Sequence, residues 1–474
     1  MEKNMSEKQM YQVKDILDLM HLHNGRFYLN TVFGGGAFNY LLYNSDQHPV
    51  LIADIRDQKS VPVIFLWRKK RVELRFNSLE GVLSRFDIHD IYINHLIFAQ
   101  PLFDWPARLE KIIENRKLHL LIHDYFAICP SVTLLDHEGR YCEVPDAETC
   151  KVCMSKILHT DQSAQYSKIF VKQYATEVSD GIMDWRDCWM KICALTATII
   201  FPSNATADIF ARAFPSIPIN KLLVVPHSIG HFKASAEPLQ KEPSPVMDIC
   251  LIGDISDHKG ARILDRMLEL TNEKKIPFRF HVLGDFLYHE RHFNDPHFEL
   301  HGRFAPNELS EMLTRVKPDL FMFTSIWPET FSFVIHEMIS TGIPIISTNI
   351  GAHADALKGR VDATLIDDFS AHGFLTAAFD RYRVLLSEYT GGLITFSTSP
   401  ELELTFSEPL GKHINSWAVT SLKELKSTRR KIRELEERIL APEKKKIPAY
   451  RLFLYETKQH LKRMLRKIKS KVVR

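Results

Sequence analysis

The chain has 474 residues, of which 45% are hydrophobic, a composition that predicts two or three packed domains and excludes wholesale disorder. Its formal net charge of only +3 argues against a dedicated nucleic-acid-binding protein. The N-terminal residues lack the apolar core of a signal peptide, and no apolar run approaches the ~20 residues of a membrane span. We therefore expect a cytoplasmic protein whose seven cysteines are thiols or metal ligands rather than disulfides.

The first half of the chain alternates short apolar runs with helical stretches, which indicates an α/β domain with a mostly parallel sheet. A Pro-rich polar stretch after Pro226 is typical of a linker, so we place the first domain at residues 1–230 and the linker at 231–246. The expected helices are residues 38–43, 185–197 and 205–214, and the expected strands are 26–33, 50–55, 61–67, 71–76, 88–94, 118–123, 198–202 and 222–226.

Two features at strand ends of this domain are candidates for ligand contact. Gly34, Gly35 and Gly36 follow the first strand, where a glycine turn lets backbone N–H groups approach an anion or a sugar. The alternative is a simple tight turn. His123 ends the strand at 118–123 and can contact a substrate, or it can be satisfied by local hydrogen bonds.

Cys129, Cys142, Cys150 and Cys153 are close in sequence, and the last two have the C-x-x-C spacing of a metal knuckle. Four thiolates would close a tetrahedral structural zinc site, with no open position for catalysis. The alternative is a set of small buried thiols with a chance C-x-x-C spacing.

The second domain is expected at residues 247–400, with strands at 247–252, 278–283, 320–323, 344–347 and 363–366, and helices at 261–270 and 374–386. Gly253 begins the loop after the first of these strands, and Lys259 lies in the same loop, before a helix. A lysine ammonium and a helix N-terminus together suit a diphosphate. The alternative is a solvent-exposed lysine.

The most informative stretch is residues 319–357, which read as strand, loop, helix, strand and glycine turn. Ser332 is expected to cap the helix and Gly342 to end it. Glu329 in the loop and Glu337 in the helix would lie roughly 10 Å apart at 1.5 Å per residue. Both can line one crevice at the carboxyl ends of the strands and accept hydrogen bonds from a sugar or a ribose. Alternatively, they are an ordinary loop acid and a solvated helix acid.

The order of these residues resembles the E-x7-E signature of the retaining glycosyltransferases of family 4, which have the two-domain GT-B fold. The matching residues are Pro328-Glu329-Thr330, Glu337, Gly342-Ile343-Pro344 and Gly351-Ala352. The resemblance implies two doubly wound, Rossmann-like α/β domains facing one another across a cleft, with a nucleotide diphosphate sugar held by the second. It further implies that Glu329 faces the donor sugar and that Glu337 holds the ribose.

The resemblance extends to other positions. His123-Asp124-Tyr125 and Cys129-Pro130 are similar to a run in family members that build surface polysaccharides, which implies that His123 contacts the donor sugar and that Asp124 orients it. Lys259 matches the family's diphosphate-binding lysine. Asp254 stands where the family has an arginine, and Arg303 is the candidate replacement. The remaining donor contacts implied are Gly253, Gly35, Gly36, Thr330, Phe331 and Gly351.

Residues 401–474 are expected to form a return segment and a basic amphipathic helical tail. Its cations include Lys458, Lys462, Arg463, Arg466, Lys467, Lys469 and Lys471. Such a helix at residues 450–474 can lie on an anionic membrane, peripheral to its inner face. Alternatively, it docks on the protein with a solvated basic face.

The resemblance therefore implies a retaining, metal-independent hexosyltransferase that uses no cofactor for catalysis beyond its nucleotide-sugar donor, and the four cysteines are candidate ligands of a structural zinc. By resemblance, it would move a rhamnosyl or mannosyl group to a glycan or lipid-linked acceptor in cell-surface polysaccharide or lipopolysaccharide biosynthesis, beside other assembly enzymes. The alternatives are a GT-B epimerase, an inverting transferase, or a non-catalytic module that binds a nucleotide sugar or glycan and scaffolds an assembly complex.

Overall fold

The computed structural model describes residues 7–56, 60–68, 70–97, 99, 101–157, 171–172, 181–228 and 244–389. The chain divides into two compact units, Met1–Thr405 and Phe406–Arg474. The second unit, which includes the basic helix expected at residues 450–474, lies outside the described residues. The first unit contains two sheets, and we call the parts built around them the N-terminal lobe, up to residue 228, and the C-terminal lobe, from residue 244.

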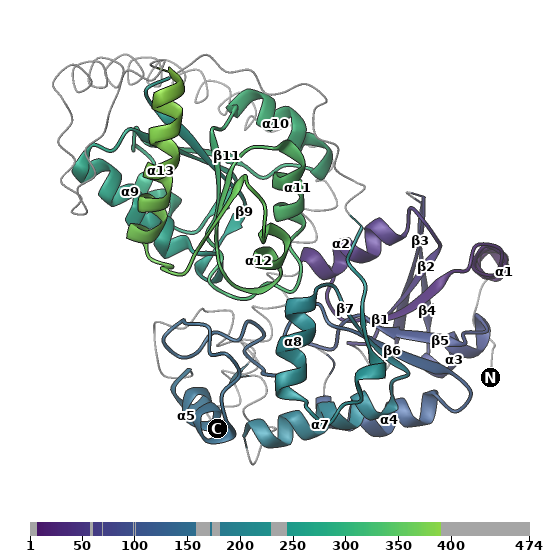
Figure 1. Ribbon diagram of the computed structural model, residues 1–474. Coiled ribbons are helices and arrows are strands. Elements are labelled where there is room, and N and C mark those ends of the chain that lie inside the picture. The colour runs from purple at the N-terminus through teal and green to yellow at the C-terminus, as the bar shows by residue number, and fades with distance from the viewer. Residues whose placement is uncertain are drawn as a thin grey trace, which may run out of the picture. The chain divides into compact units, whose positions relative to one another are not determined.

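The N-terminal lobe is built on an eight-stranded sheet, in which all neighbours from β2 through β1 to β8 are parallel (Figure 1). The β3–β4 hairpin extends one edge with antiparallel pairing. The spatial order is β4 (Lys70–Phe76), β3 (Val61–Trp67), β2 (Val50–Asp54), β1 (Arg26–Asn30), β5 (Asp90–Ile93), β6 (Lys117–Leu121), β7 (Thr198–Phe201) and β8 (Leu222–Val224).

Helices cover both faces of this sheet because successive strand residues point to opposite sides. Phe27 and Leu29 of β1 belong to the larger core, whereas Tyr28 packs with Leu41 of α2 (Gly35–Asn44) on the other face. The other helices are α1 (Glu7–Leu22), α3 (Leu79–Arg85), η1 (Leu102–Asp104), α4 (Trp105–Ile112), α5 (Ala147–Ile157), α7 (Ile182–Leu195), α8 (Asn204–Ala213) and η2 (Ile219–Lys221).

The C-terminal lobe has a six-stranded, wholly parallel sheet. Its order is β11 (Phe298–Gly302), β10 (Phe278–Phe286), β9 (Met247–Ile255), β12 (Leu320–Phe323), β13 (Ile345–Thr348) and β14 (Ala363–Ile366). Helices α9 (Ala261–Lys274) and α13 (Ala371–Tyr389) pack on one face, and α10 (Leu309–Val316), α11 (Phe333–Thr341) and α12 (Gly351–Leu357) on the other (Figure 1). The short helices are η3 (Asp257–Lys259), η4 (His289–His292) and η5 (Pro306–Glu308).

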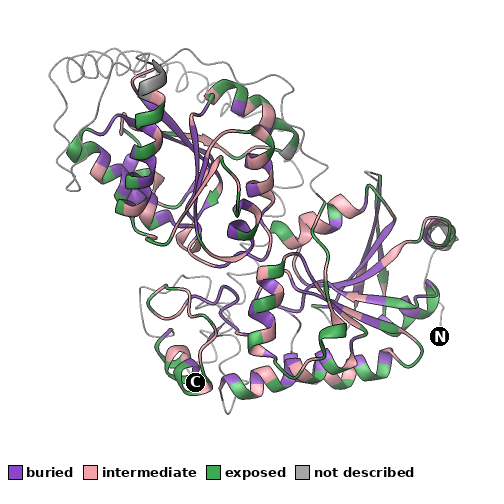
Figure 2. Cartoon of the chain, in the orientation of Figure 1, coloured by how far each residue is buried: buried purple, intermediate pink, exposed green. Residues whose placement is uncertain are grey.

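The strands form the buried centre of each lobe, and the helices expose their outer faces (Figure 2). The expected α/β class with two mostly parallel sheets is confirmed. No helix among the described residues is long and apolar enough to cross a membrane. Several elements begin or end up to four residues from the expected bounds, and one of these differences concerns a candidate site residue. β9 runs on through Gly253 to Ile255 because Gly253 pairs with Gly284 of β10, so Gly253 is a strand residue and not a turn.

Candidate functional site

The loop between β12 and α11 carries the first candidate acid. The Ser332 hydroxyl accepts a hydrogen bond from the Ile335 N–H at 3.3 Å, so it caps α11 as predicted. Gly342 ends the helix in the left-handed conformation, with φ of 74°. These two residues fix the start and end of the helix that carries Glu337.

Gly351 allows α12 to pack tightly against this loop. Its φ is +62°, and a Cβ at this position would lie 2.6 Å from the backbone of Pro328. The next residue, Ala352, donates its N–H to the Glu329 carbonyl at 2.8 Å. A glycine is therefore needed here for close approach, and the packing holds the Glu329 backbone against the N-terminus of α12.

Glu329 and Glu337 are both buried, at 4% and 8% exposure. The interpretation of either residue as a solvated acid is therefore wrong. The Oε1 atom of Glu329 is buried without a hydrogen bond, and its charged neighbour is the Lys259 ammonium, with Nζ at 3.9 Å. The Trp327 Nε1 atom in the same loop also lacks a hydrogen-bond partner. Buried polar groups are rarely left unpaired, so these atoms mark a place where a polar ligand can bind.

Lys259 reaches this carboxylate because its own loop is tied to the end of β12. The Thr324 hydroxyl donates to the Lys259 carbonyl at 2.7 Å, and the Ile326 N–H donates to the His258 carbonyl at 3.1 Å. Gly260, with φ of +83°, leaves no room for a Cβ against the Thr324 carbonyl oxygen. The Lys259 side chain remains one-third exposed, so its ammonium can meet a bound anion.

Two histidines beside Lys259 are held neutral. Burial, and to a smaller extent the Lys259 charge, lowers the pKa of His258 to about 3. The same two causes lower the pKa of His353, on α12, to about 3. These imidazoles add no positive charge around neutral pH, so Lys259 supplies the cation at this point of the site.

Thr330 links the loop to the N-terminal lobe. Its hydroxyl donates to the His123 carbonyl at 2.6 Å, and its carbonyl accepts from the hydroxyls of Ser203 and Thr206 at 3.0 and 3.1 Å. Ser203 also caps α8, because its hydroxyl accepts the Thr206 N–H. The structure thus brings His123 to the loop that carries Glu329 and uses the Thr330 side chain in this link between the lobes.

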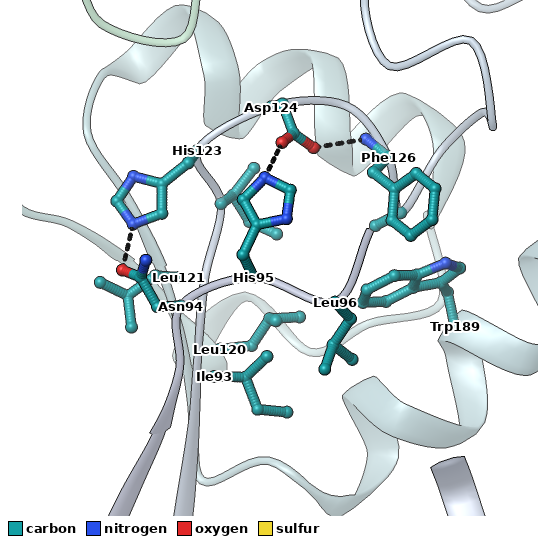
Figure 3. A pocket seen from close by; sticks show the side chains of 12 residues that line it. Ile93, Asn94, His95, Leu96, Leu120, Leu121, His123, Asp124, Phe126 and Trp189 are labelled. Carbon is teal, nitrogen blue, oxygen red and sulfur yellow. Dashed lines mark hydrogen bonds and ion pairs between the residues drawn. The ribbon is translucent and has the colours of Figure 1, made fainter. Parts of the chain in front are cut away.

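His123 is held by Asn94, which follows the neighbouring strand β5 (Figure 3), and Asn94 is in turn held by Asn30 at the end of β1. The His123 Nε2 lies 2.8 Å from the Asn94 Oδ1, while the Asn94 Nδ2 donates to the Asn30 Oδ1 at 2.9 Å and to the Ala37 carbonyl at 3.3 Å. Asn94 therefore presents an acceptor, and His123 donates from Nε2, which leaves Nδ1 as an acceptor. Burial is the main cause that holds the His123 pKa well below its ordinary value. The Nδ1 atom of this neutral ring can accept a hydrogen bond from a sugar hydroxyl.

Asp124 does not orient His123. Its carboxylate instead contacts the His95 Nε2 at 2.5 Å and accepts from the Phe126 N–H at 2.8 Å (Figure 3). The His95 Nδ1 accepts the Ile97 N–H at 3.3 Å. The expected role of Asp124 is therefore wrong, because the turn after β6 directs it towards the loop that follows β5.

An aromatic cluster lies beside this network, and the sequence did not indicate it. The His227 ring centroid lies 4.5 Å from that of Tyr40, 5.3 Å from that of His123 and 4.8 Å from that of Phe331. Burial lowers the pKa of His227 to about 3. Like His123, both His227 and Asn94 are polar residues at the end of an expected strand or directly after one. The same sequence pattern could therefore have identified them as candidates.

Gly35 and Gly36 lie in the first turn of α2 rather than in a loop before it. No atom lies within 4 Å of where a Cβ would stand on either residue, so the space beside them is open. At the other end of α2, burial and then the Glu337 charge raise the pKa of Tyr43 to about 12, which places Glu337 close to this helix. Tyr43 also stacks edge-on with Phe333, with centroids 5.3 Å apart.

Arg303, the candidate replacement for the family's arginine, pairs with carboxylates. Its Nη2 lies 2.7 Å from Asp254 Oδ2 and 3.5 Å from Asp285 Oδ2. One guanidinium facing two carboxylates leaves a net negative charge at this end of β9 and β10. This environment weakens Arg303 as a phosphate cation and leaves that role to Lys259.

The four candidate zinc ligands lie in one region. Burial and then the charge of Cys129 raise the pKa of Cys142 to about 12, with smaller contributions from Cys150 and Cys153. Cys150 also contacts Arg186, whose Nη2 is 3.7 Å from Sγ. Among the described residues, no three of these sulfur atoms lie within 4.8 Å of one another. The zinc site stays a prediction.

One family model matches part of the C-terminal lobe. Residues 247–380 match the family model described as "Glycosyl transferases group 1". No curated protein matches.

Solved structures match over most of the chain at low identity. The Anabaena protein HepE in complex with UDP has 14% identity and a TM-score of 0.47, over 88% of this chain and 96% of that one. A glycosyltransferase from Rickettsia africae has 14% identity and a TM-score of 0.47, over 88% and 99%. The catalytic domain of starch synthase IV from Arabidopsis thaliana, bound to ADP and acarbose, has 12% identity and a TM-score of 0.45, over 84% and 99%. The segment that matches the family model is the one that contains Lys259, Glu329 and Glu337.

Proposed function

We propose that this protein is a retaining glycosyltransferase of the GT-B type that moves a hexosyl group from a nucleotide diphosphate sugar to a hydroxyl of a glycan or lipid-linked acceptor. The observation that carries the proposal is the buried Glu329 carboxylate, which has an oxygen without a hydrogen bond 3.9 Å from Lys259, inside the segment that matches a glycosyltransferase family model. A hydroxyl of a donor sugar can donate a hydrogen bond to this oxygen, and the negative charge of a diphosphate can pair with the lysine ammonium.

Each residue has a separate task in the proposed reaction. The bond between the anomeric carbon and the diphosphate breaks with its electron pair going to the phosphate oxygen, the acceptor oxygen bonds to that carbon, and the acceptor's hydroxyl proton passes to the departing phosphate. Lys259 would stabilise the charge that develops on the diphosphate. Glu329 and the Nδ1 of His123 would accept hydrogen bonds from sugar hydroxyls, and Glu337 would accept from the ribose. Retention rests on the resemblance to family 4.

The finer parts of the proposal rest on resemblance. They are a rhamnosyl or mannosyl donor, a role in cell-surface polysaccharide biosynthesis, and peripheral attachment to an anionic membrane through residues 450–474. The segment 450–474 lies outside the described residues.

The first test is a thermal-shift panel of uridine, guanosine, adenosine and thymidine diphosphate sugars. A true donor at a hundred times its dissociation constant should stabilise the protein by about 2.7 kcal/mol. Release of nucleoside diphosphate in the presence of acceptor then measures turnover. We expect Lys259→Ala and Glu329→Gln each to lower turnover by about 10²-fold or more.

Matched controls separate the site from a general effect of charge. Lys274→Ala and Glu290→Gln change an exposed lysine and an exposed glutamate of the same lobe and should leave turnover unchanged. Tight donor binding without turnover on any acceptor would instead support the non-catalytic scaffold. Product with inverted anomeric configuration would rule out retention but not the transferase.

A further inference from the structure

A second cluster of polar side chains lies at the β10–β11 edge of the C-terminal sheet, outside the proposed donor site. His281 of β10 and Glu299 and His301 of β11 each offer one ligand atom, and these atoms all lie within 4.8 Å of one another. The register pairs His281 with Glu299, and residues two apart on a strand share a face, so Glu299 and His301 both face His281. The His281 Nδ1 lies 3.0 Å from the His301 Nε2 and 3.6 Å from the Glu299 Oε2.

A buried carboxylate fixes the orientation of His281. The His281 Nε2 lies 3.0 Å from the Asp248 Oδ1, and that carboxylate, with 3% of its side chain exposed, also accepts from the Arg279 Nε at 2.5 Å. The ring therefore donates from Nε2 to Asp248 and directs the Nδ1 lone pair towards Glu299 and His301. This carboxylate–histidine arrangement is the one that positions metal-ligating histidines in proteins.

We propose that His281, Glu299 and His301 bind a divalent transition metal, with zinc the best fit to two imidazoles and one carboxylate. Ligands at 2.0–2.1 Å from a tetrahedral zinc lie roughly 3.3 Å apart, and the two pairs that involve His281, at 3.0 and 3.6 Å, bracket that value. The Glu299 side chain is 51% exposed, so the fourth position is open to water.

Without a metal, the two histidines share one proton in an ordinary hydrogen bond. Metal binding would remove that proton from the His301 Nε2, while His281 already presents its lone pair. The expected consequence is structural, because the metal would tie edge strand β11 to β10, two residues before Arg303. The proposal does not depend on the glycosyltransferase function.

Cobalt(II) replaces zinc in such sites and reports its ligands by absorption, so it is the probe. The full-length chain is stripped with EDTA, dialysed and titrated with CoCl₂. We expect one ion at this site, displaced by ZnCl₂, with visible d–d bands that need no cobalt–thiolate charge-transfer band in the near ultraviolet; a second ion bound by the cysteines would add such bands, and those would be lost in Cys150→Ser. His301→Ala and Glu299→Gln should each weaken this binding at least ten-fold, and Asp248→Asn about 10–100-fold.

Controls separate this site from the cysteines and from loss of folding. Cys150→Ser and the exposed His372→Ala should leave the d–d titration unchanged. Circular dichroism and the urea midpoint check that His301→Ala and Glu299→Gln are folded, and both positions are at least partly exposed. The proposal would be overturned by d–d bands that are unchanged in both His301→Ala and Glu299→Gln, by loss of all d–d bands in Cys150→Ser, or by no uptake at millimolar Co²⁺.

Discussion

Glu329 keeps a carboxylate oxygen buried without a hydrogen bond, and the Lys259 ammonium lies at 3.9 Å. Removing a carboxylate from water costs free energy that one lysine at this distance repays only in part. Sites that bind charged or polar ligands are commonly destabilising in the unliganded protein, and the bound ligand supplies the missing interactions. Glu329 should therefore contribute more to binding than to folding.

Glu329→Gln should consequently leave the free energy of unfolding unchanged or raise it by up to about 1 kcal/mol, while donor binding falls. Urea unfolding at pH 7 measures the first quantity, and calorimetric titration with the donor measures the second. Glu290→Gln, at an exposed position, should stay within about 0.5 kcal/mol of the native chain. If Glu329→Gln loses more than 1 kcal/mol, the carboxylate is mainly structural.

Asn94 should contribute mainly to folding, because both its amide oxygen and its amide nitrogen have hydrogen-bond partners within the protein. It accepts from His123 and donates to Asn30 and Ala37. Asn94→Ala leaves the His123 Nε2–H and the Asn30 Oδ1 buried without these partners, so we expect a loss of about 1–3 kcal/mol in urea unfolding. Asn77→Ala, at an exposed position of the same lobe, is the control. Equal midpoints for the two variants would contradict the network.

At the scale of elements, the junction of α12 with the β12–α11 loop depends on Gly351. A Cβ there would meet the Pro328 backbone at 2.6 Å, and the φ of +62° also disfavours a side chain. Gly359 is a matched control, because its φ is +78° but no atom lies within 4 Å of its Cβ position.

Gly359→Ala should cost about 1–2 kcal/mol from backbone strain alone. Gly351→Ala should cost this amount plus about 1–3 kcal/mol for the clash, and it should also weaken donor binding because Glu329 is displaced. Urea unfolding and donor titration of both variants measure the difference. If the two variants behave alike, the close packing does not position Glu329.

The sequence predicts best those elements whose ends are marked by local residues. β12 and β14 have their predicted bounds, and Ser332 and Gly342 delimit α11 as expected. The end of β9 was wrong because its pairing with Gly284 is a tertiary contact that extends the strand through a glycine. The candidate acids and Lys259 could be predicted from spacing and resemblance. The role of Asp124 could not, because its partner His95 belongs to another strand end.

At the scale of the whole molecule, burial sets the charge state of several histidines. Burial lowers the pKa of His227, His258 and His353 to about 3 each, below the value of about 6.5 of an exposed histidine. Between pH 6.5 and 3 the unfolded chain therefore binds more protons than the folded one. Their stabilising effect is complete above pH 6.5 and decreases as the pH falls towards 3.

His292 has the opposite effect, because hydrogen bonds to Asp295 and Asp265 outweigh burial and raise its pKa. His48, His123 and His301 also have lowered pKa values, so the histidines whose pKa is lowered outnumber His292 and should make the net dependence of these groups destabilising in acid. Each of the three histidines with a pKa of about 3 should cost about 2 kcal/mol of unfolding free energy between pH 7 and pH 5, since 1.5 pH units below 6.5 correspond to about 2 kcal/mol.

Urea unfolding at pH 7, 6 and 5 tests this dependence, and His353→Gln assigns part of it to one ring. Glutamine retains a donor for the Thr348 hydroxyl, which the native His353 Nε2 contacts at 2.9 Å, but it does not titrate. The variant should lose about 2 kcal/mol less than the native chain on going from pH 7 to pH 5. His372→Gln, on the exposed side of α13, should show the native dependence. A native slope in His353→Gln would mean that this ring titrates in the folded protein as it does in the unfolded chain, and it would then add positive charge near Lys259 only below about pH 6.5.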